Sequence, residues 1–359
     1  MAASTLTEVA RLAGVSPATA SRVLNGSARK PGKDIAERVR QAADSLGYIP
    51  NAQAQGLAKS SSGLIGLIVH DIADPYFAAI ARGVQEAARE QRKMVLLATT
   101  GGGPAEEKEA VAAFAARRAD SIVIAGSRSC RDEDADGNAE LAAELDRYCR
   151  NGGQVAVVGH PVVGAAAQEG YHVVTVPNQE LAGQLATELA AGWEGEFVIV
   201  AGPEGLLTSD DRVRGFQEGL ERAGHTAAEV LRTTFNRSGG YEAGLQLAAR
   251  IKAAASEGTA APKLCIFAVN DVMAIGAAAA LRSEGLRIPR DAAIAGFDDI
   301  ETLRDFRPAL STVRLPLEDI GRLATRATGH HQDNGDDDDA SPDAISGEVT
   351  LRRSTEQAA

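Results

Sequence analysis

Cysteine pairs and long apolar runs are both absent from this 359-residue sequence. Its three cysteines (Cys130, Cys149 and Cys265) form no CxxC pair, so neither a disulfide framework nor a zinc site is expected. No apolar run approaches the ~18 residues of a membrane-spanning helix, and the N-terminus has no signal-peptide core. We therefore expect a soluble protein of the cytoplasm. The length is about twice the ~150 residues of one domain, which predicts two or three compact units.

Enzyme signatures are also missing. Gly26 to Lys33 resembles a phosphate loop, but five residues separate its glycines where the motif requires four. Gly101-Gly102-Gly103 follows a predicted strand, yet Glu106 stands where a dinucleotide fingerprint needs its last glycine. Neither GxSxG nor HExxH occurs. Asp298-Asp299 is left as a candidate acid–base pair, and we expect no catalytic activity and no cofactor.

Charge is unevenly distributed along the chain. Residues 1–60 contain eight Lys/Arg and four Asp/Glu, a net charge of +4. Because the net charge of the whole chain is −12, the remaining residues carry −16. A basic head joined to an acidic body suggests a phosphate-binding module attached to a domain of another kind. The alternative is that the basic residues only form a solvated surface.

The head has the pattern of short helices. Apolar residues from Leu6 to Ala13 recur at helical spacing, and Gly14 then ends the helix. Ser16-Pro17 is a favoured helix start, which predicts a second helix from Pro17 to Leu24. Apolar residues from Ile35 to Leu46 predict a third. Helix, short glycine-containing turn and helix is the helix-turn-helix layout.

After a flexible joint at 60–63, apolar runs alternate with helical stretches. Runs that are apolar throughout indicate parallel strands covered on both faces, and so many units over about 290 residues predict two α/β lobes. The expected strands are Leu64–Val69, Met94–Ala98, Ile122–Ala125, Val155–Val158, Val173–Val176, Phe197–Ala201, Leu264–Val269 and Ala293–Phe297.

The segment from His330 to Ala344 is acidic and of low complexity. Because its like charges repel and its only apolar side chains are small, so that it cannot form a core, we expect a solvated loop. A metal site formed by His330, His331 and the aspartates is the alternative, and we predict none.

Several motifs occur in a fixed order. The head contains TLTEVA (5–10), AGVSPATASRVLNG (13–26), LGYIPN (46–51) and QGLA (55–58). The body contains DPYF (74–77), RVRGF (212–216), VND (269–271), GFDD (296–299) and LRRST (351–355). This series resembles the lactose-repressor (LacI/GalR) family of bacterial transcription regulators over nearly the whole chain. The resemblance implies a sequence-specific DNA-binding regulator, expected to be a repressor, located in the cytoplasm and associated with the nucleoid.

The family match implies which head residues contact DNA. Pro17, Ala18 and Arg22 are expected to face the bases, where Arg22 can make a bidentate contact to guanine and the other two only apolar contacts. Residues expected to position the backbone are Thr5, Leu6, Ser16, Thr19, Ser21 and Asn25. For Ser16 and Thr19, capping and packing alone are the alternative.

The match also implies a hinge. Its expected DNA-contacting residues are Tyr48, Asn51, Leu57 and Ala58. Leu57 resembles the family's minor-groove wedge, which partly unstacks a central base step and bends the duplex. Packing of Leu57 against its twin in a dimer is the alternative, and both can hold together.

The body resembles the two-lobed periplasmic sugar-binding fold, whose ligands lie beyond the carboxyl ends of strands. The expected effector-binding residues are Tyr76, Phe77, His160, Arg212, Phe235, Asn270 and Asp298. Core packing is the alternative for the two adjacent aromatic residues, whereas a carboxylate that ends an apolar strand, like Asp298, needs partners. Pro177-Asn178 stands where many members carry Asp-Asn, so the expected effector is a small polar molecule, most often a sugar in this family, rather than a specified hexose.

Together these expectations describe an N-terminal all-α helix-turn-helix head joined to an α/β periplasmic-binding-protein-like body of two doubly wound parallel-sheet lobes. The expected divisions are a DNA-binding domain at 1–50, a hinge at 51–62 and a body at 63–359, with lobes of 63–174 plus 314–343 and 175–313 plus 344–359. We expect a homodimer on near-palindromic operator DNA, because the family's tetramer-forming leucine heptad is absent. The alternatives are a solute-binding protein of transport type and a cytosolic α/β sugar-modifying enzyme.

Overall fold

The computed structural model describes residues 4–25, 31–49, 61–256, 263–329 and 345–356. The chain divides into two compact units, Met1–Gly63 and Leu64–Ala359, which we call the head and the body. Among the residues described, no helix is both long and apolar enough to span a membrane.

The head contains three described helices, α1 (Leu6–Ala13), α2 (Pro17–Asn25) and α3 (Lys33–Ser45). Thr5 caps α1 in a reciprocal capping box with Glu8, and Gly14 ends the helix with a left-handed φ of 67°, which glycine adopts without strain. The predicted helices are therefore confirmed, with ends that differ by one or two residues.

A small core holds these helices together. Its buried residues are all alanine or valine, and the helices can therefore pack closely. They are Val9, Ala10, Ala13, Ala20, Val39, Ala42 and Ala43. Leu6 and Tyr48 pack against this core from its edge.

The first lobe of the body is built on a parallel five-stranded sheet of order β2-β1-β3-β4-β5. Its strands are β1 (Leu64–Val69), β2 (Met94–Thr99), β3 (Ser121–Ala125), β4 (Gln154–Val158) and β5 (Tyr171–Val174). The central strands β1, β3 and β4 are buried on both faces, as their continuous apolar sequence predicts. The edge strand β2 leaves Met94 and Leu97 exposed.

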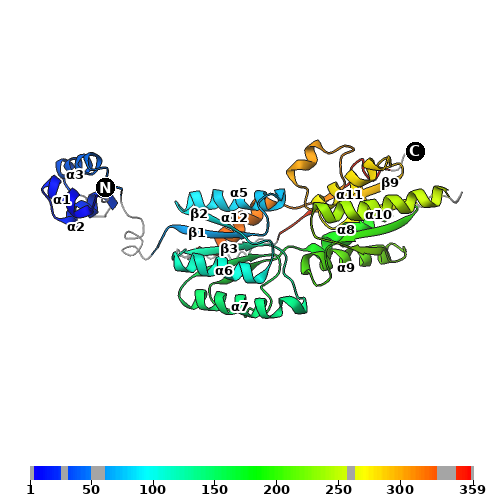
Figure 1. Ribbon diagram of the computed structural model, residues 1–359, viewed down its shortest axis with the longest axis horizontal. Helices are drawn as coiled ribbons and strands as arrows, with labels where there is room; N and C mark the ends of the chain where they lie inside the picture. The colour runs from blue at the N-terminus through cyan, green and yellow to red at the C-terminus, as the bar shows by residue number, and fades with distance from the viewer. Residues whose placement is uncertain (1–3, 26–30, 50–60, 257–262, 330–344, 357–359) are drawn as a thin grey trace. The chain divides into compact units, whose positions relative to one another are not determined.

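Helices cover both faces of this sheet (Figure 1). They are α5 (Pro75–Glu90), α6 (Pro104–Ala116), α7 (Ala135–Arg150) and α12 (Leu317–Ala327), with the short helix η1 (Asp132–Asp134) before α7. The pair α5 and α12 packs on one face, and the pair α6 and α7 on the other. At Gly83 in α5 the two helices approach so closely that a Cβ atom would lie 1.9 Å from the Glu318 carbonyl oxygen of α12.

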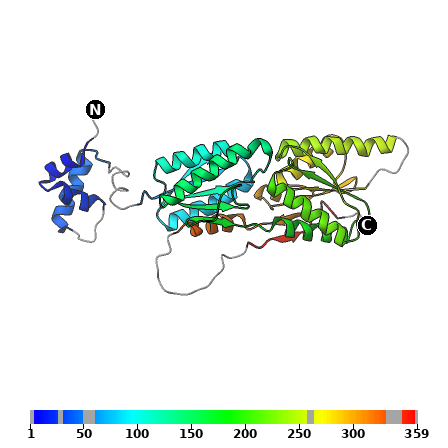
Figure 2. The ribbon, with the colours of Figure 1, turned by 90° about the horizontal axis from the view of Figure 1, so that it is seen from below.

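The second lobe is built on a parallel four-stranded sheet of order β7-β6-β8-β9. Its strands are β6 (Glu196–Ala201), β7 (Glu229–Arg232), β8 (Leu264–Ala268) and β9 (Ala292–Ala295). Its helices are α8 (Asn178–Ala190), α9 (Leu207–Arg222), α10 (Arg237–Ser256) and α11 (Asp271–Ser283), with η2 (Glu301–Asp305) after β9. Figure 2 shows the two sheets side by side in separate lobes.

The sequence predicted most of these strands correctly. β1 has the expected bounds, but β5 lies two residues earlier than Val173–Val176, and β9 ends at Ala295 rather than Phe297. The chain turns between Val176 and Asn178, where the Asn178 N–H donates to the Val176 carbonyl, so these residues cannot extend β5. The edge strand β7 was not predicted, because its sequence EVLR is half charged.

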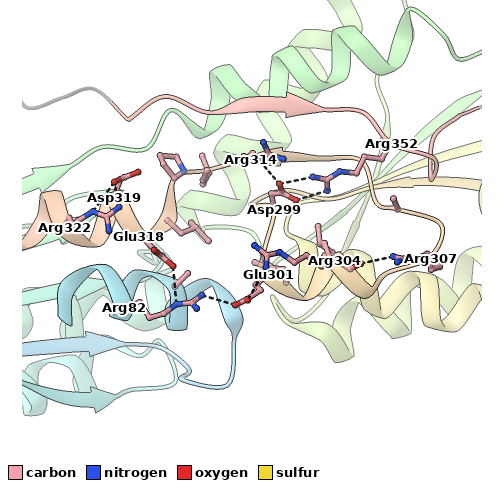
Figure 3. A pocket seen from close by; sticks show the side chains of 17 residues that line it. Arg82, Asp299, Glu301, Arg304, Arg307, Arg314, Glu318, Asp319, Arg322 and Arg352 are labelled. Atoms are coloured by element: carbon pink, nitrogen blue, oxygen red, sulfur yellow. Dashed lines mark hydrogen bonds and ion pairs between the residues drawn. The ribbon is translucent and has the colours of Figure 1, made fainter. Parts of the chain in front are cut away.

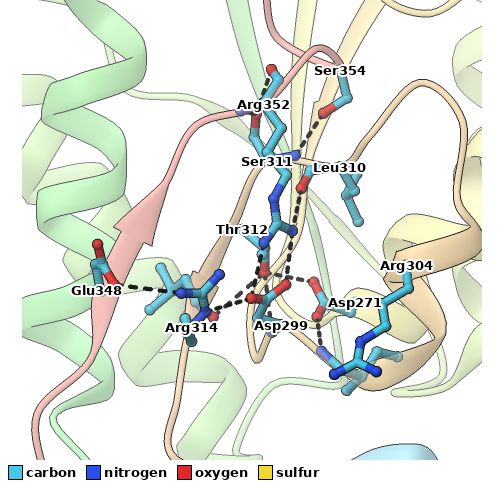
Figure 4. A network of polar contacts seen from close by, with 12 residues as sticks. Asp271, Asp299, Arg304, Leu310, Ser311, Thr312, Arg314, Glu348, Arg352 and Ser354 are labelled. Carbon is cyan, nitrogen blue, oxygen red and sulfur yellow. Dashed lines mark hydrogen bonds and ion pairs between the residues drawn. The ribbon is translucent and has the colours of Figure 1, made fainter.

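Two short strands join the lobes. β10 (Thr312–Arg314) pairs antiparallel with β11 (Glu348–Thr350). Figure 4 shows how side chains tie them to the second lobe. Both Nη groups of Arg352 donate hydrogen bonds to the Asp299 carboxylate, at 2.7 and 2.9 Å. Arg314 Nε donates a hydrogen bond to the same carboxylate at 2.7 Å. The crossing segments are therefore anchored at Asp299, directly after Asp298 of the predicted effector site.

Candidate functional site

The first turn of α2 is the exposed end of the helix-turn-helix. Ser16 Oγ lies 2.9 Å from Thr19 Oγ1 and accepts the Thr19 N–H at 3.2 Å, so this serine caps α2. Pro17 and Ala18 follow it and are exposed. Ser16 therefore caps α2 with Thr19 as its partner, and DNA contact by these two residues stays a prediction.

Arg22 lies one turn further along α2 and is exposed. None of the described residues forms an ion pair or hydrogen bond with its guanidinium. Ser21 and Asn25 are half-buried, and Asn25 Nδ2 donates to Ser21 Oγ at 2.9 Å. Thr5 is exposed at the start of α1, whereas Leu6 and Tyr48 pack against the head core. Asn51, Leu57 and Ala58 lie outside the described residues.

A cleft of about 670 Å³ separates the two lobes of the body. Its lining residues follow the carboxyl ends of strands in both sheets, as expected of ligand sites in open α/β sheets. Six of the seven predicted effector residues line it. They are Tyr76, Phe77, Arg212, Phe235, Asn270 and Asp298.

His160 is the seventh, and its side chain does not line the cleft. Its Nε2 atom lies 2.8 Å from the Asp211 Oδ2 atom of α9, on the other lobe. The imidazole is therefore occupied by a carboxylate partner, and it joins the lobes where the sequence predicted a ligand contact.

Arg212 is the best-fixed side chain of the cleft, with 2% of its surface exposed. Its Nε donates to Asn178 Oδ1 at 2.9 Å, its Nη1 to the Val269 carbonyl at 2.7 Å and its Nη2 to Asp298 Oδ1 at 2.9 Å. The guanidinium also lies 3.8 Å from the centre of the Phe297 ring. These contacts hold Arg212 as a rigid platform behind the ligand space.

Asp298 lies three residues after the end of β9, and the expectation that its carboxylate needs a partner is met by Arg212. Burial raises the pKa of Asp298 to about 7, against the opposing effect of the Arg212 charge. Arg212 occupies Oδ1, and no described residue hydrogen-bonds to Oδ2. This oxygen can therefore accept a hydrogen bond from a ligand.

Asn270 and Asp74 cap helices that begin at the cleft. Asn270 Oδ1 accepts the Met273 N–H of α11 at 2.8 Å, which leaves its Nδ2 group to donate to a ligand. Asp74 Oδ1 accepts the Tyr76 N–H of α5 at 2.9 Å, and burial raises the pKa of its carboxyl. Both side chains are thus held by the backbone of the helix that they start.

Aromatic rings form the apolar walls. The Tyr76 and Phe77 rings meet edge to face with centroids 5.1 Å apart, and Phe235 lies after β7 on the second lobe. Phe77 is 9% exposed and also belongs to the body core, so it both packs and lines the cleft. Ring faces with polar groups between them suit a hydroxylated ring.

Several residues that line the cleft were not predicted from the sequence. His70, Asp74, Glu106 and Asn178 line the cleft although none of them was predicted as a site residue. Each follows a predicted strand or starts a helix, and this position was the signal that could have identified them.

A second cavity, of about 690 Å³, lies between α5, α12, η2 and β10 (Figure 3). Six arginines and four acidic residues line it, and several of them pair with one another. Arg82 contacts Glu301 at 3.1 Å and Glu318 at 3.3 Å, and Arg352 is bound to Asp299. The polar groups of this cavity largely satisfy each other, so the interlobe cleft is the better ligand site. Within the described ranges, no cluster of His, Cys, Asp and Glu could hold a metal ion; His330 and His331 lie outside them.

Comparisons with known proteins agree with this architecture. Residues 5–51 match the family described as bacterial regulatory proteins, lacI family, and residues 195–355 match a periplasmic binding protein-like domain. The ribose operon repressor of Halalkalibacterium halodurans is 32% identical over 90% of this chain and 88% of its own length. The HTH-type transcriptional repressor PurR of Haemophilus influenzae is 29% identical over 92% and 93%.

Solved structures show the same fold. A transcriptional regulator CelR–cellobiose complex aligns with a TM-score of 0.63 at 26% identity, covering 98% of this chain and 99% of that one. The Lac repressor dimer bound to operator and an anti-inducer aligns with a TM-score of 0.75 at 23% identity, covering 99% of both chains. The likeness extends over both the helical head and the two-lobed body. The chain belongs to the lacI family of bacterial regulatory proteins.

Proposed function

We propose that this protein is a sequence-specific DNA-binding repressor whose operator affinity is controlled by a small polar effector in the interlobe cleft. The observation that carries the proposal is that one chain contains both an exposed helix-turn-helix and a cleft. The polar side chains of that cleft are held in place but keep hydrogen-bonding atoms free for a ligand. It acts in the cytoplasm as a homodimer on near-palindromic DNA, because two identical heads match a two-fold operator. It is a regulator and not an enzyme.

The head reads the major groove with the start of α2. Arg22 makes a bidentate contact to guanine, and Pro17 and Ala18 make apolar contacts such as one to a thymine methyl group. Thr5, Leu6, Ser16, Thr19, Ser21 and Asn25 fix the register on the phosphate backbone. The exposure of Arg22 and its lack of a partner among the described residues support this assignment, since no internal bond must break before it binds DNA.

The hinge follows the head. Tyr48 and Asn51 contact the duplex, and Leu57 with Ala58 enters the minor groove and bends the DNA. The family motif in the sequence supports this part of the proposal.

The effector is a sugar or sugar derivative. Asp298 Oδ2 accepts from its hydroxyl groups, Asn270 Nδ2 donates to them, and Tyr76, Phe77 and Phe235 pack against the ring. The relatives named for ribose repression and for a cellobiose complex support a sugar. A neutral polyhydroxyl also fits the oxygen acceptors and ring faces of the cleft.

Effector binding is coupled to lobe closure because residues of both lobes line the cleft. The loop after β3 already touches the second lobe: the Leu207 N–H donates to the Arg128 carbonyl at 2.9 Å, and the Thr208 N–H donates to Ser127 Oγ at 3.2 Å. A ligand that binds the closed arrangement better than the open one shifts the population toward closure. The effect of the effector on operator affinity is then a coupling free energy between the cleft and the DNA-binding head.

Selection of genomic fragments by the purified protein tests the DNA-binding function. We expect enrichment of near-palindromic sites and a gel shift at moderate salt that disappears when residues 1–60 are deleted. Equal binding of all sequences, or a shift that survives the deletion, would refute the proposal and favour a solute-binding protein or an enzyme.

A further inference from the structure

The carboxylate of Asp298 is carried by a strained turn. Asp298 and Asp299 are consecutive residues with φ angles of 117° and 54°, in the left-handed region that residues with a side chain rarely adopt. Such a backbone persists only where the surrounding contacts fix it. The contacts of this turn therefore decide where the Asp298 carboxylate lies.

The backbone of the turn is bonded to the crossing strand β10. The Asp298 N–H donates to the Val313 carbonyl at 2.8 Å, and the Leu315 N–H donates to the Asp298 carbonyl at 3.3 Å. Beyond Leu315 the chain enters α12, which packs against α5 of the first lobe. The carboxylate that faces the ligand is thus attached to the segment that joins the two lobes.

Arg352, near the C-terminus, binds the second residue of the turn. Its Nη1 donates to Asp299 Oδ1 at 2.7 Å and its Nη2 to Asp299 Oδ2 at 2.9 Å, and Nη1 also donates to the Leu310 carbonyl at 2.9 Å (Figure 4). The side chain of Asp299 is 11% exposed and that of Arg352 is 22% exposed. A two-pronged ion pair that is largely shielded from water fixes both position and orientation.

The charge of Asp299 depends on this pair. Burial alone would raise the pKa of its carboxyl, but Arg352 and Arg314 outweigh burial and lower the pKa, so the carboxylate is ionised. Arg314 donates to the same carboxylate, but about half of its side chain is exposed (52%), so solvent screens its contribution. Arg352 is therefore the main partner of Asp299.

The segment that carries Arg352 is built into the second lobe. Ser354 is fully buried, its Oγ donates to the Ile294 carbonyl of β9 at 2.6 Å, and it accepts the Ser311 N–H at 2.8 Å. The Ser311 hydroxyl accepts the Arg352 N–H at 2.7 Å. These bonds fix the backbone at Arg352, so its guanidinium contacts Asp299 from a rigid position.

We propose that Asp299, held by Arg352, is a positioning residue for effector binding. The ion pair fixes the turn so that the neighbouring Asp298 carboxylate meets both Arg212 and the ligand. Neither Asp299 nor Arg352 lines the interlobe cleft, so both act through the turn and not by touching the ligand. This inference rests on the proposed effector role of the cleft, and it makes the C-terminal segment part of the binding machinery.

Hydrogen exchange in the ligand-free, full-length protein tests the positioning directly. In Arg352→Leu the Asp298 and Leu315 amides should exchange at least about tenfold faster, while exchange in α11 stays the same. Arg352→Lys keeps the charge but not the two-pronged contact, so it should give an intermediate rate. Arg353→Leu, a change at the next residue, which is exposed, should leave the turn as it is.

Calorimetry with ribose, galactose, glucose and cellobiose measures the consequence for binding. For the sugar that binds most tightly, Arg352→Leu should weaken affinity about tenfold and keep the number of sites per chain, and Arg352→Lys should recover part of the loss. A merely structural role would instead lower the number of sites at unchanged affinity. Operator affinity without sugar should not change, because the substitution lies in the body.

Three results would overturn the positioning role. They are unchanged exchange at the turn in Arg352→Leu, an equal loss of sugar affinity in Arg353→Leu, and a loss of sites at unchanged affinity. If none of the four sugars binds the unsubstituted protein, the sugar effector of the proposed function fails, and exchange at the turn alone decides whether Arg352 positions Asp298. Sequence-specific DNA binding stands or falls separately, in the genomic selection.

Discussion

The head and the body present their functional side chains in opposite ways. In the head, Arg22 is exposed and unpaired among the described residues, above a small core of alanine and valine. In the body, Arg212 is 2% exposed and bound by Asn178, Val269 and Asp298. A duplex brings a dense array of phosphates and bases to the protein, whereas a small ligand offers little area and gains most from groups that are already positioned.

The two regions also differ in net charge. The 60 N-terminal residues carry +4 and the rest carries −16. An acidic body repels DNA, which leaves the basic head as the part that engages it. Trp193, the only tryptophan, is buried in the body, so its fluorescence reports on the body alone. This allows changes in one region to be separated from changes in the other.

The largest expected effect is in the body. Arg212→Leu removes the partner of a buried carboxylate and should lower the free energy of unfolding by about 3–5 kcal/mol, as seen when one member of a buried ion pair is lost. Denaturant unfolding followed by Trp193 fluorescence measures it. Arg214→Leu, an exposed position of the same helix, should change it by less than about 0.5 kcal/mol. Equal losses for the two variants would show that Arg212 is not the fixed platform described.

The next effect is in the head. Arg22→Ala should reduce the preference for the selected operator over random DNA by about ten- to hundred-fold, because a bidentate contact to guanine is lost. Fluorescence anisotropy with the two duplexes measures it, and Arg40→Ala on α3 serves as the control for charge. Effector binding should be unaffected. A loss of affinity that is the same for both duplexes would contradict base reading by Arg22.

A smaller effect tests whether the head is stabilised independently of the body. Thr5→Ala removes the capping box of α1 and should cost about 1 kcal/mol of head stability. Hydrogen exchange in α1 and α2 should accelerate, while the Trp193 transition stays where it is. Thr7→Ala, an exposed substitution inside the same helix, is the matched control. A shift of the Trp193 transition by Thr5→Ala would show that the two regions unfold together.

The smallest effect is a pH dependence confined to the cleft. Asp298 has a pKa of about 7, raised by burial. Ligand hydroxyls donate to the ionised carboxylate, so binding favours the ionised form, and affinity is full above pH 7 and is lost as the pH falls through it. The loss between pH 8 and pH 6 should be about threefold to fivefold, because a protonated carboxyl still accepts one hydrogen bond. Calorimetry at both pH values measures it, and in Asp298→Asn the dependence should vanish.

The sequence carried more information about the head than about the cleft. Local signals such as Thr5 with Glu8, Gly14 and Ser16-Pro17 define α1 and α2 almost to the residue, because caps and turns act over a few positions. β1, β3 and β4 were also recognisable, since strands buried on both faces are apolar throughout. Asp298 was correctly expected to need a partner.

The arrangement around the cleft depends on contacts between residues distant in sequence, which periodicity does not encode. The edge strand β7 has only two apolar residues among four and was not predicted, and Phe235, which follows it, was expected at the cleft only through the resemblance to the family's fold. The pairing of His160 with Asp211, 51 residues away, took that imidazole out of the predicted ligand set. His70 and Glu106 stand after predicted strands or at a helix start, which was a usable signal, but the sequence does not show that these strand ends meet at one edge of the sheet.

The most direct test of the account is operator affinity measured with and without a saturating ligand. We would titrate the full-length protein onto its selected operator by fluorescence anisotropy at moderate salt, alone and with the sugar that binds most tightly. The account predicts a change in affinity of about 5- to 150-fold, which is retained in the exposed-site control Arg214→Leu. An operator affinity that stays the same when the cleft is saturated would contradict the control of the head by the body.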